Sequence, residues 1–424
     1  MHENLATILT ETAKRHGDGT AFKVDDVELS YTLLDEASAR VAGLLKEKGV
    51  AEGDRVGLML PNVPYFPILY FGILRAGGVV VPMNVLLKGR EVRFYLDDPG
   101  AKLLFAWHGF AEAAEAGAAD AGAECILVKP GDFEQLLASQ EPDRAMSERA
   151  AGDTAVVLYT SGTTGTPKGA ELTHANLLRN CRTTSGFARI DETEVLLGAL
   201  PLFHTFGQTC TMNCAVATGA MVTMLPRFDP EKALEIIERD AVTIFQGVPT
   251  MYNALLHAER ADSTDTSTLR LCMSGGAAIP VDLIRAFEEK FGCMILEGYG
   301  LSETSPVATF SDPDGEPLPF TQDDIRRSGA TSLPEVLRLA SNLHVAQANS
   351  SQYAISARGF NNTAANKMLV LIDGRSVYTP IHAGVFWDTQ DILLEDIDRI
   401  EVISGSGATL WGVNAVNGVI SVKT

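Results

Sequence analysis

Basic residues are scarce in this sequence, and their scarcity excludes one class of partners. The 424 residues contain 34 Lys and Arg against 54 Asp and Glu, which gives a formal net charge of −20 at pH 7. A polyanion is repelled by such a surface, so we expect no non-specific binding to nucleic acid. A nucleotide site stays compatible with this charge, because a few local donors can hold a phosphate group inside an acidic protein.

Long uninterrupted apolar runs are also lacking. The most apolar stretch, residues 56–82 with the sequence VGLMLPNVPYFPILYFGILRAGGVVVP, is interrupted by Pro61, Pro64, Pro67 and Arg75. A transmembrane helix needs about 20 consecutive apolar residues, so this stretch predicts buried core. The N-terminal sequence MHENLATILTETAKRHGDG lacks a basic segment followed by an apolar one. A secretory signal is therefore not expected, and the predicted location is the cytoplasm.

Cysteine is rare, and its spacing argues against zinc binding. None of the six cysteines forms a C-x-x-C pair, and no His/Cys cluster has the spacing of a zinc site. We expect reduced, buried thiols at all six positions, namely Cys125, Cys181, Cys210, Cys214, Cys272 and Cys293.

Helical and strand patterns alternate along the first 310 residues. Residues 30–49, SYTLLDEASARVAGLLKEKG, repeat apolar residues at helical spacing and end at a glycine. Residues 231–249 and 281–300 each have the pattern of a helix followed by a short apolar strand. This alternation predicts an α/β fold of stacked α/β layers with mostly parallel sheets.

The composition changes after about residue 310. All six cysteines precede this point, whereas seven of the 14 asparagines lie in residues 311–424. Residues 311–319, SDPDGEPLP, are rich in Pro, Gly and Asp, as linkers are. We therefore predict a domain at 1–310, a seam at 311–319 and a small α+β domain at 320–424. In that domain, residues 367–378 have the pattern of a strand, an Asp-Gly turn and a second strand.

Residues 158–174, LYTSGTTGTPKGAELTH, combine glycine, hydroxyl and lysine side chains after an apolar strand. Glycines allow backbone N–H groups to approach a phosphate closely, and Lys168 supplies positive charge. The loop is not a Walker A motif, because Pro167 precedes the lysine. A glycine-rich surface turn is the alternative, but the length of the pattern favours a phosphate-binding loop. Four hydroxyls in the loop can donate to phosphate oxygens: Thr160, Ser161, Thr163 and Thr164.

This loop resembles the signature loop of the AMP-forming acyl-activating enzymes, which include acyl-CoA synthetases, luciferases and peptide-synthetase adenylation domains. Similar motifs follow in the family's order: PLFHTFG at 201–207, GVPTMYNALL at 247–256, SGGAAIP at 274–280 and GYGLSET at 298–304. The resemblance implies the fold of the family's large domain. It also implies ATP-dependent activation of a carboxylate, first as an acyl-adenylate and then as a CoA thioester.

The resemblance implies roles for individual residues. Lys168, Glu303 and His204 are the expected catalytic residues, and Glu303 with Thr163 is expected to hold Mg²⁺. The motifs are most similar to those of medium- and long-chain fatty acyl-CoA synthetases, so the expected ligands are a fatty acid, ATP and CoA. The expected acyl pocket comprises His204, Val248, Met251 and Tyr252. The expected ATP-binding residues are Thr160, Ser161, Gly162, Thr163, Thr164, Gly165, Lys168, Gly275, Gly276, Ala277, Gly298, Tyr299, Gly300, Ser302 and Glu303.

Three further features of that family have no counterpart in residues 306–424. They are a Tyr/Thr-Gly-Asp segment whose aspartate binds the ribose hydroxyls, a hinge with Asp and Arg, and a mobile lid domain with a catalytic lysine. Losing such a lysine or carboxylate typically costs on the order of a few kcal/mol of transition-state stabilisation. The sequence therefore predicts impaired turnover, and ATP–pyrophosphate exchange well above that of a Lys168→Ala variant would contradict it.

Residues 320–424 resemble a different family, the plug domain of TonB-dependent outer-membrane receptors. The segments ARGF at 357–360, VLIDGRSVY at 370–378, EDIDRIEVI at 395–403 and GVNAVNGVI at 412–420 stand in that family's order. In a receptor the plug fills a large β-barrel, so this half is expected to lack its barrel partner. Three arginines that would face that partner are expected to be solvated or paired locally: Arg358, Arg375 and Arg399.

Three interpretations stay open at this stage. The chain is an ATP-dependent acid–thiol ligase of impaired activity, a receptor plug module of the outer membrane, or a join of two truncated genes in which neither half works. The loop at 160–168 favours the first for any chemistry.

Overall fold

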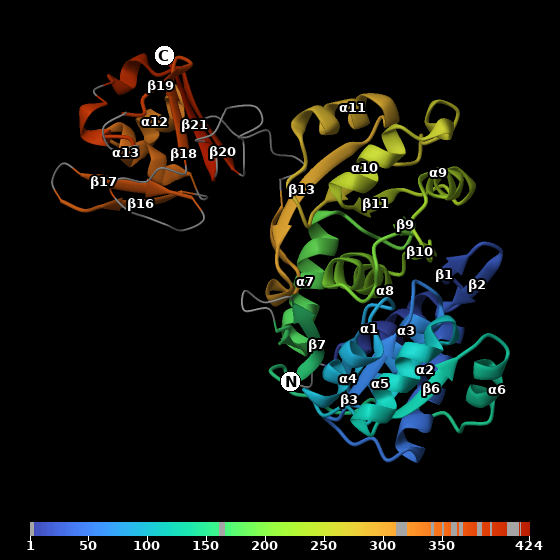
Figure 1. Ribbon diagram of the computed structural model, residues 1–424. Coiled ribbons are helices and arrows are strands. Elements are labelled where there is room, and N and C mark those ends of the chain that lie inside the picture. The colour runs from blue at the N-terminus through green and yellow to red at the C-terminus, as the bar shows by residue number, and fades with distance from the viewer. Residues whose placement is uncertain are drawn as a thin grey trace. The chain divides into compact units, whose positions relative to one another are not determined.

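The computed structural model describes residues 4–160, 166–310, 320–340, 343–349, 352–357, 363, 368–379, 384–390, 392–404, 415 and 417–424 (Figure 1). The chain divides into a first unit, Met1–Pro313, and a second unit, Asp314–Thr424. The predicted seam at 311–319 lies outside the described residues. Within the described ranges, no helix combines the length and the apolar character that a membrane span requires.

The first unit contains two mostly parallel sheets. A six-stranded sheet has the order β6-β5-β3-β4-β7-β8, in which β8 is antiparallel to β7. An eight-stranded sheet has the order β14-β13-β12-β11-β9-β10-β1-β2, with β14 and β2 antiparallel to their neighbours. The strands are β1 Thr20–Val24, β2 Val27–Ser30, β3 Arg55–Met59, β4 Val79–Pro82, β5 Leu103–Trp107, β6 Glu124–Val128, β7 Thr154–Thr160, β8 Lys168–Thr173, β9 Val195–Gly198, β10 Met221–Met224, β11 Ile244–Gly247, β12 Leu271–Ser274, β13 Met294–Gly300 and β14 Val307–Phe310.

Helices lie between the two sheets and on their outer faces. One hydrophobic cluster joins strands of both sheets to α1, α2 and α3, while separate clusters join α4 and α5 to one sheet and α9 to α11 to the other. This confirms the predicted fold of stacked α/β layers. The helices are α1 Thr7–His16, α2 Tyr31–Glu47, α3 Tyr65–Arg75, α4 Gly89–Asp97, η1 His108–Phe110, α5 Ala111–Ala121, α6 Asp132–Ala138, α7 His174–Phe187, the π-helix η2 Phe206–Asn213, α8 Cys214–Thr218, α9 Pro230–Arg239, α10 Pro249–Leu256, η3 Glu259–Asp262, α11 Val281–Phe291 and η4 Ser302–Thr304.

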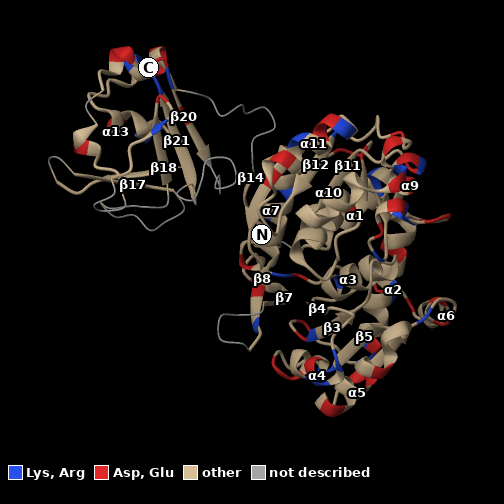
Figure 2. Ribbon diagram, turned by 45° about the horizontal axis from the view of Figure 1, so that its top comes forward, with Lys and Arg blue, Asp and Glu red and all other residues tan. Residues whose placement is uncertain are grey.

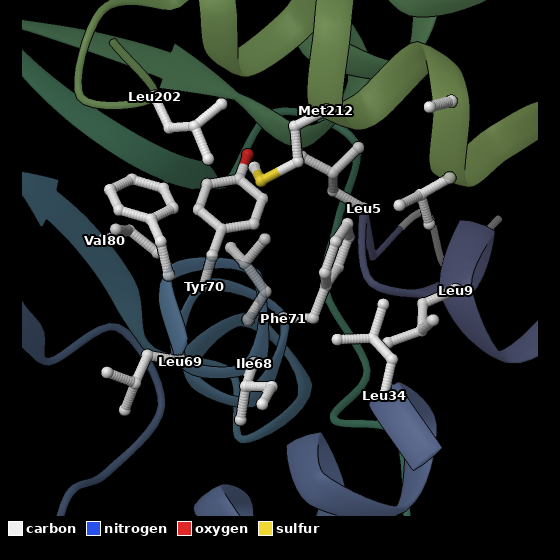
Figure 3. Close-up of a cluster of buried hydrophobic side chains, with 14 of the residues drawn as sticks. Leu5, Leu9, Leu34, Ile68, Leu69, Tyr70, Phe71, Val80, Leu202 and Met212 are labelled. Atoms are coloured by element: carbon white, nitrogen blue, oxygen red, sulfur yellow. The ribbon is translucent and has the colours of Figure 1, made fainter. Parts of the chain in front are cut away.

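The core between the sheets is built around α3, which comes from the apolar stretch that the sequence predicts to be buried. Figure 3 shows Tyr70 and Phe71 of this helix among Leu34 of α2, Leu202 and Met212. All five side chains are at most 1% exposed. Leu202 and Met212 follow β9 of the eight-stranded sheet. Burial of α3 against them therefore places side chains from both sheets in one core.

Local signals account for the helix ends. The side chain of Ser30 accepts a hydrogen bond from the Leu33 N–H at 3.3 Å and caps α2. After α2 the chain turns at Gly49, whose φ of +72° favours glycine. The helix predicted at 30–49 is thus confirmed as Tyr31–Glu47. Figure 2 shows charged residues on the outer helices α9 and α11, whereas strands β11 and β12 carry none.

The second unit is a small α+β unit, as predicted. Its sheet has the order β15-β20-β21-β18-β19, and a separate hairpin pairs β16 with β17. Asp373 and Gly374, with φ values of +48° and +79°, form the expected turn between β18 and β19. Its elements are β15 Phe320–Thr321, α12 Gln322–Ser328, α13 Leu333–Val336, η5 Leu337–Leu339, β16 His344–Gln347, β17 Tyr353–Ser356, β18 Met368–Ile372, β19 Arg375–Ser376, η6 Trp387–Thr389, η7 Leu394–Asp396, β20 Arg399–Ser404 and β21 Gly418–Lys423.

Candidate functional site

The predicted phosphate loop lies between two antiparallel strands. β7 ends at Thr160 and β8 begins at Lys168, and these two residues are paired across the ladder. The apolar run of β7 is buried in the sheet, whereas the Lys168 side chain is exposed to solvent. The structure therefore fixes both ends of the loop. Five predicted ATP-binding residues lie outside the described residues: Ser161, Gly162, Thr163, Thr164 and Gly165.

Four other predicted segments lie at one edge of the eight-stranded sheet. Strands β9, β11, β12 and β13 are neighbours and run parallel, so their carboxyl ends share that edge (Figure 1). His204 follows β9, Val248 follows β11, Gly275 follows β12, and Tyr299 lies at the end of β13. In parallel sheets this edge is where ligands bind. The structure thus brings together residues that are about 95 positions apart in the chain.

Close packing explains the small residues after β12. A Cβ placed on Gly275 would lie 3.0 Å from Cε1 of the Phe206 ring. Gly276 has a φ of +79°, and a Cβ there would lie 3.5 Å from Cγ1 of Val248. Phe206 and Val248 therefore lie against the backbone that is expected to face adenine. Phe206 was not among the predicted site residues, although its place in PLFHTFG, two residues after His204, could have marked it.

A buried asparagine holds the loop that carries His204. The Asn62 side-chain amide donates to the carbonyls of Gly198 at 2.9 Å and Leu200 at 2.8 Å. Its oxygen accepts from the Leu202 N–H at 3.0 Å. Asn62 is 4% exposed and follows β3 of the other sheet. Sequence reasoning missed this residue.

His204 lies at the surface end of this loop and precedes the π-helix η2. Its carbonyl accepts from the Gln208 N–H at 2.9 Å, which joins the loop to η2. Partial burial lowers the pKa of the imidazole, because the charged form loses solvation. This shift favours the neutral form of the ring. π-Helical turns are frequently found at functional sites.

The GYGLSET segment forms a tight turn between β13 and β14. Tyr299 is 48% exposed, and Glu303 lies in η4 with its side chain towards solvent. A Cβ on Gly300 would overlap the carbonyl oxygen of Pro306, so glycine is required there. η4 contacts β8, the strand that begins at Lys168. The structure therefore places the segments of Glu303 and Lys168 side by side.

The two predicted acyl-pocket residues on α10 differ in burial. Met251 is half-buried, whereas Tyr252 is fully buried, with its ring centroid 5.1 Å from those of Phe245 and Phe287. Burial raises the pKa of the Tyr252 hydroxyl well above its usual value. Tyr252 is thus a residue of the core between β11 and α11, and its contact with an acyl chain stays a prediction.

Of the two predicted metal residues, the structure describes only Glu303. Among the described residues, no three His, Cys, Asp or Glu side chains are grouped so that they could hold a metal ion. Glu303 offers one carboxylate, exposed to solvent, and Thr163 lies outside the described residues. Such a donor set suits Mg²⁺ that arrives with a triphosphate, because Mg²⁺ is commonly held by one or two carboxylates plus substrate phosphates.

Comparison with protein families assigns both parts of the chain. The family model described as AMP-binding enzyme matches residues 9–334. The model described as TonB-dependent receptor plug domain matches residues 319–419. Both resemblances seen in the sequence are thereby confirmed.

Curated relatives match the first part of the chain. A long-chain-fatty-acid–CoA ligase of Bacillus subtilis is 32% identical over 341 residues, which cover 72% of this chain and 61% of the ligase. A feruloyl-CoA synthase of an Amycolatopsis species is 36% identical over 334 residues, which cover 76% of this chain and 64% of the synthase. The match therefore spans less than two thirds of either relative.

Solved structures agree with this assignment. ATP-bound MatB from Rhodopseudomonas palustris superposes with a TM-score of 0.69 at 33% identity, covering 76% of this chain and 64% of MatB. The inhibitor-bound N-terminal domain of FACL13 from Mycobacterium tuberculosis superposes with a TM-score of 0.70 at 26% identity, covering 84% of this chain and 89% of that domain. With its family model matched over residues 9–334, this chain belongs to the AMP-binding enzyme family.

Proposed function

We propose that the first unit activates a carboxylic acid with ATP, forming an acyl-adenylate and then a CoA thioester, as fatty acid–CoA ligases do. One observation carries the proposal. The segments at His204, Val248, Gly275 and Tyr299 meet at one sheet edge, and η4, which contains Glu303, contacts the strand that begins at Lys168. Motifs that are dispersed in the sequence thus form one region.

Adenylation chemistry explains why such a region is needed. A carboxylate oxygen forms a bond to the α-phosphorus of ATP, and the bond from that phosphorus to pyrophosphate breaks. Because two anions must meet, catalysis depends on positioning and on neutralising charge. Lys168 would supply positive charge to the phosphates, and the exposed ring of Tyr299 would give adenine an apolar face.

Mg²⁺ is part of this proposal. Glu303 would hold the ion together with phosphate oxygens of ATP, and the bound ion would neutralise phosphate charge. The exposed carboxylate of Glu303 and the neighbouring strand β8 support this assignment.

The proposed acid substrate is a medium- or long-chain fatty acid. The imidazole of His204, whose lowered pKa favours its neutral form, and the apolar side chains of Val248 and Met251 would line its path. A pocket lined by a neutral ring and apolar side chains suits the acyl chain of a fatty acid better than it suits a charged amino acid. Since one relative is a feruloyl-CoA synthase, an aromatic acid is the competing substrate class to include in any assay.

Thermal unfolding with Mg²⁺ and ATP tests the nucleotide site. Ligand at 100 times its Kd stabilises the binding state by about 2.7 kcal/mol, so the Tm of the first unit should rise with ATP concentration. Lys168→Ala should remove most of this rise. Lys129→Ala is a matched control, because this exposed lysine pairs with Asp132 at 2.8 Å on another part of the surface.

The same proteins then report on chemistry through ATP–pyrophosphate exchange with fatty and aromatic acids. Exchange that needs a fatty acid and is lost in Lys168→Ala would support adenylation. A wild-type Tm that does not respond to Mg²⁺ and ATP would refute the nucleotide site itself. Release of AMP on adding CoA would extend the result to the second half-reaction.

The second unit supports a second candidate function, that of a receptor plug. Its match to the plug model and its own sheet and core favour this reading for residues 319–419. A β-barrel partner and an outer-membrane location belong to this candidate, whereas a cytoplasmic location belongs to the ligase. Fractionating cells that express the whole chain would distinguish the two locations.

A further inference from the structure

The side-chain amide of Asn180 joins α7 to the segment that follows Glu303. Its nitrogen donates to the carbonyl of Thr304 at 3.2 Å and to that of Val307 at 2.8 Å. Its oxygen accepts from the Val307 N–H at 3.4 Å. Asn180 is half-buried, so these contacts are partly shielded from water. Figure 1 shows α7 beside β13, the strand that leads into this segment.

The segment held by Asn180 is a turn whose residues 301–306 are joined to one another by backbone hydrogen bonds. The Leu301 N–H donates to the Pro306 carbonyl at 3.1 Å, and the Thr304 N–H donates to the Leu301 carbonyl at 3.0 Å. Ser305 has a φ of +75°, which is uncommon for a residue other than glycine and persists only where surrounding contacts hold it. A shift of residues 304–307 would therefore move Glu303 with them.

Asn180 is also connected through the chain to Lys168. Strand β8 begins at Lys168 and runs into α7, which begins at His174 and contains Asn180. The first turn of α7 is fixed, because the Thr173 side chain accepts from the Asn176 N–H at 3.2 Å and the His174 Nδ1 accepts from the Leu5 N–H at 3.0 Å. One continuous stretch of chain thus connects Lys168 to the amide that holds the Glu303 turn.

We propose that Asn180 is a positioning residue, which sets the place of Glu303 relative to Lys168 for binding of Mg²⁺ with ATP. This proposal rests on the function proposed above and adds a residue to it. Only an amide offers two N–H donors and an acceptor on one short side chain. Aspartate would keep the acceptor but lose both donors, and it would place a negative charge beside two carbonyl oxygens.

The first test measures the turn without any ligand. Amide hydrogen exchange of residues 301–310 is compared in the whole wild-type chain, Asn180→Ala, Asn180→Asp and Asn176→Ala. Asn176 is the matched control, since it lies one helical turn earlier on α7 with its side chain exposed. We expect at least tenfold faster exchange in this turn for both Asn180 variants and no change for Asn176→Ala. Asn180→Ser, which keeps one donor, should be intermediate and serves if the other variants do not fold.

The second test measures how the rise in Tm produced by ATP depends on Mg²⁺ concentration. Removing a residue that orients a metal ligand typically weakens the metal by 10- to 100-fold, so half-maximal protection should need about tenfold more Mg²⁺ in Asn180→Ala. Protection by ATP without added Mg²⁺ should be the same in all variants.

The outcomes separate this proposal from the one that it rests on. Unchanged exchange in the turn overturns the positioning role whatever the ligand data show. Faster exchange with an unchanged Mg²⁺ requirement overturns it as well, because Asn180 then only stabilises the fold. A wild-type chain that ATP and Mg²⁺ fail to protect refutes the proposed function instead, and the positioning role falls with it.

Discussion

Single buried amides organise the candidate site at the residue scale. Asn62 satisfies two carbonyls and one N–H of the loop between β9 and His204, at the boundary of the two sheets. Buried backbone groups that lose their partners cost about 1–3 kcal/mol each when water cannot replace them. The shape of this loop therefore depends on one side chain from a distant part of the sequence.

Asn62→Ala is expected to destabilise the first unit by roughly 2–4 kcal/mol, because the Leu200 carbonyl and the Leu202 N–H lose their partner, whereas the Gly198 carbonyl keeps the Leu225 N–H at 3.1 Å. Urea unfolding at constant pH measures this loss. Asn84→Ala is the control, since the Asn84 side chain accepts a single local bond from the Leu86 N–H at 2.9 Å. Equal stabilities of the two variants would show that Asn62 does not hold the loop.

Helix α7 carries a titratable group at its first turn, so the stability of this element is expected to depend on pH. His174 is fully buried, and its Nδ1 accepts from the Leu5 N–H. Burial and, to a smaller extent, the nearby charge of Arg149 lower the pKa of His174 to about 4, and Asp153 opposes them only in part. The folded state therefore holds this imidazole in its neutral form.

The contribution of His174 to the free energy of unfolding should be fully present above pH 6.5. It should decline as the pH falls towards 4, because the imidazole of the unfolded chain takes up a proton at a higher pH than that of the folded chain. A shift of this size corresponds to roughly 3 kcal/mol over the whole interval. Unfolding free energies measured between pH 4.5 and 7.5 should fall more steeply for the wild type than for His174→Asn, which keeps an acceptor near Leu5. His257→Asn, at an exposed position, should retain the wild-type slope. Parallel curves for wild type and His174→Asn would contradict the assignment.

The two units have separate cores at the scale of the whole molecule. The hydrophobic clusters of the first unit contain only residues up to Phe310, and those of the second contain only residues from Phe320 onwards. Cooperative unfolding follows shared cores, so each unit is expected to unfold by itself.

Calorimetry of the whole chain should therefore resolve two transitions. ATP with Mg²⁺ should raise only the larger one, because the proposed nucleotide site lies wholly within the first unit. The Lys168→Ala chain should show both transitions without the shift. One transition that moves as a whole would mean that the units unfold together.

The local elements were within reach of sequence reasoning, because their signals lie in short stretches. Helix α2, the helix–strand pairs at α9 with β11 and α11 with β13, and the turn at Asp373 and Gly374 all follow from periodicity, caps and turn residues. The glycine-rich pattern before Lys168 likewise predicted a loop after an apolar strand, whereas the antiparallel return strand β8 was not predicted.

The residue order alone thus settled the α/β class, the two families and the motifs of the candidate site. The tertiary structure decided which of these motifs meet, since the order β13-β12-β11-β9 depends on the packing of apolar faces across the core. It also placed Tyr252 in the core and gave Asn62 and Asn180 partners 136 and 127 positions away. Those partners are backbone carbonyls, which every residue carries, so no pattern of side chains could have revealed them.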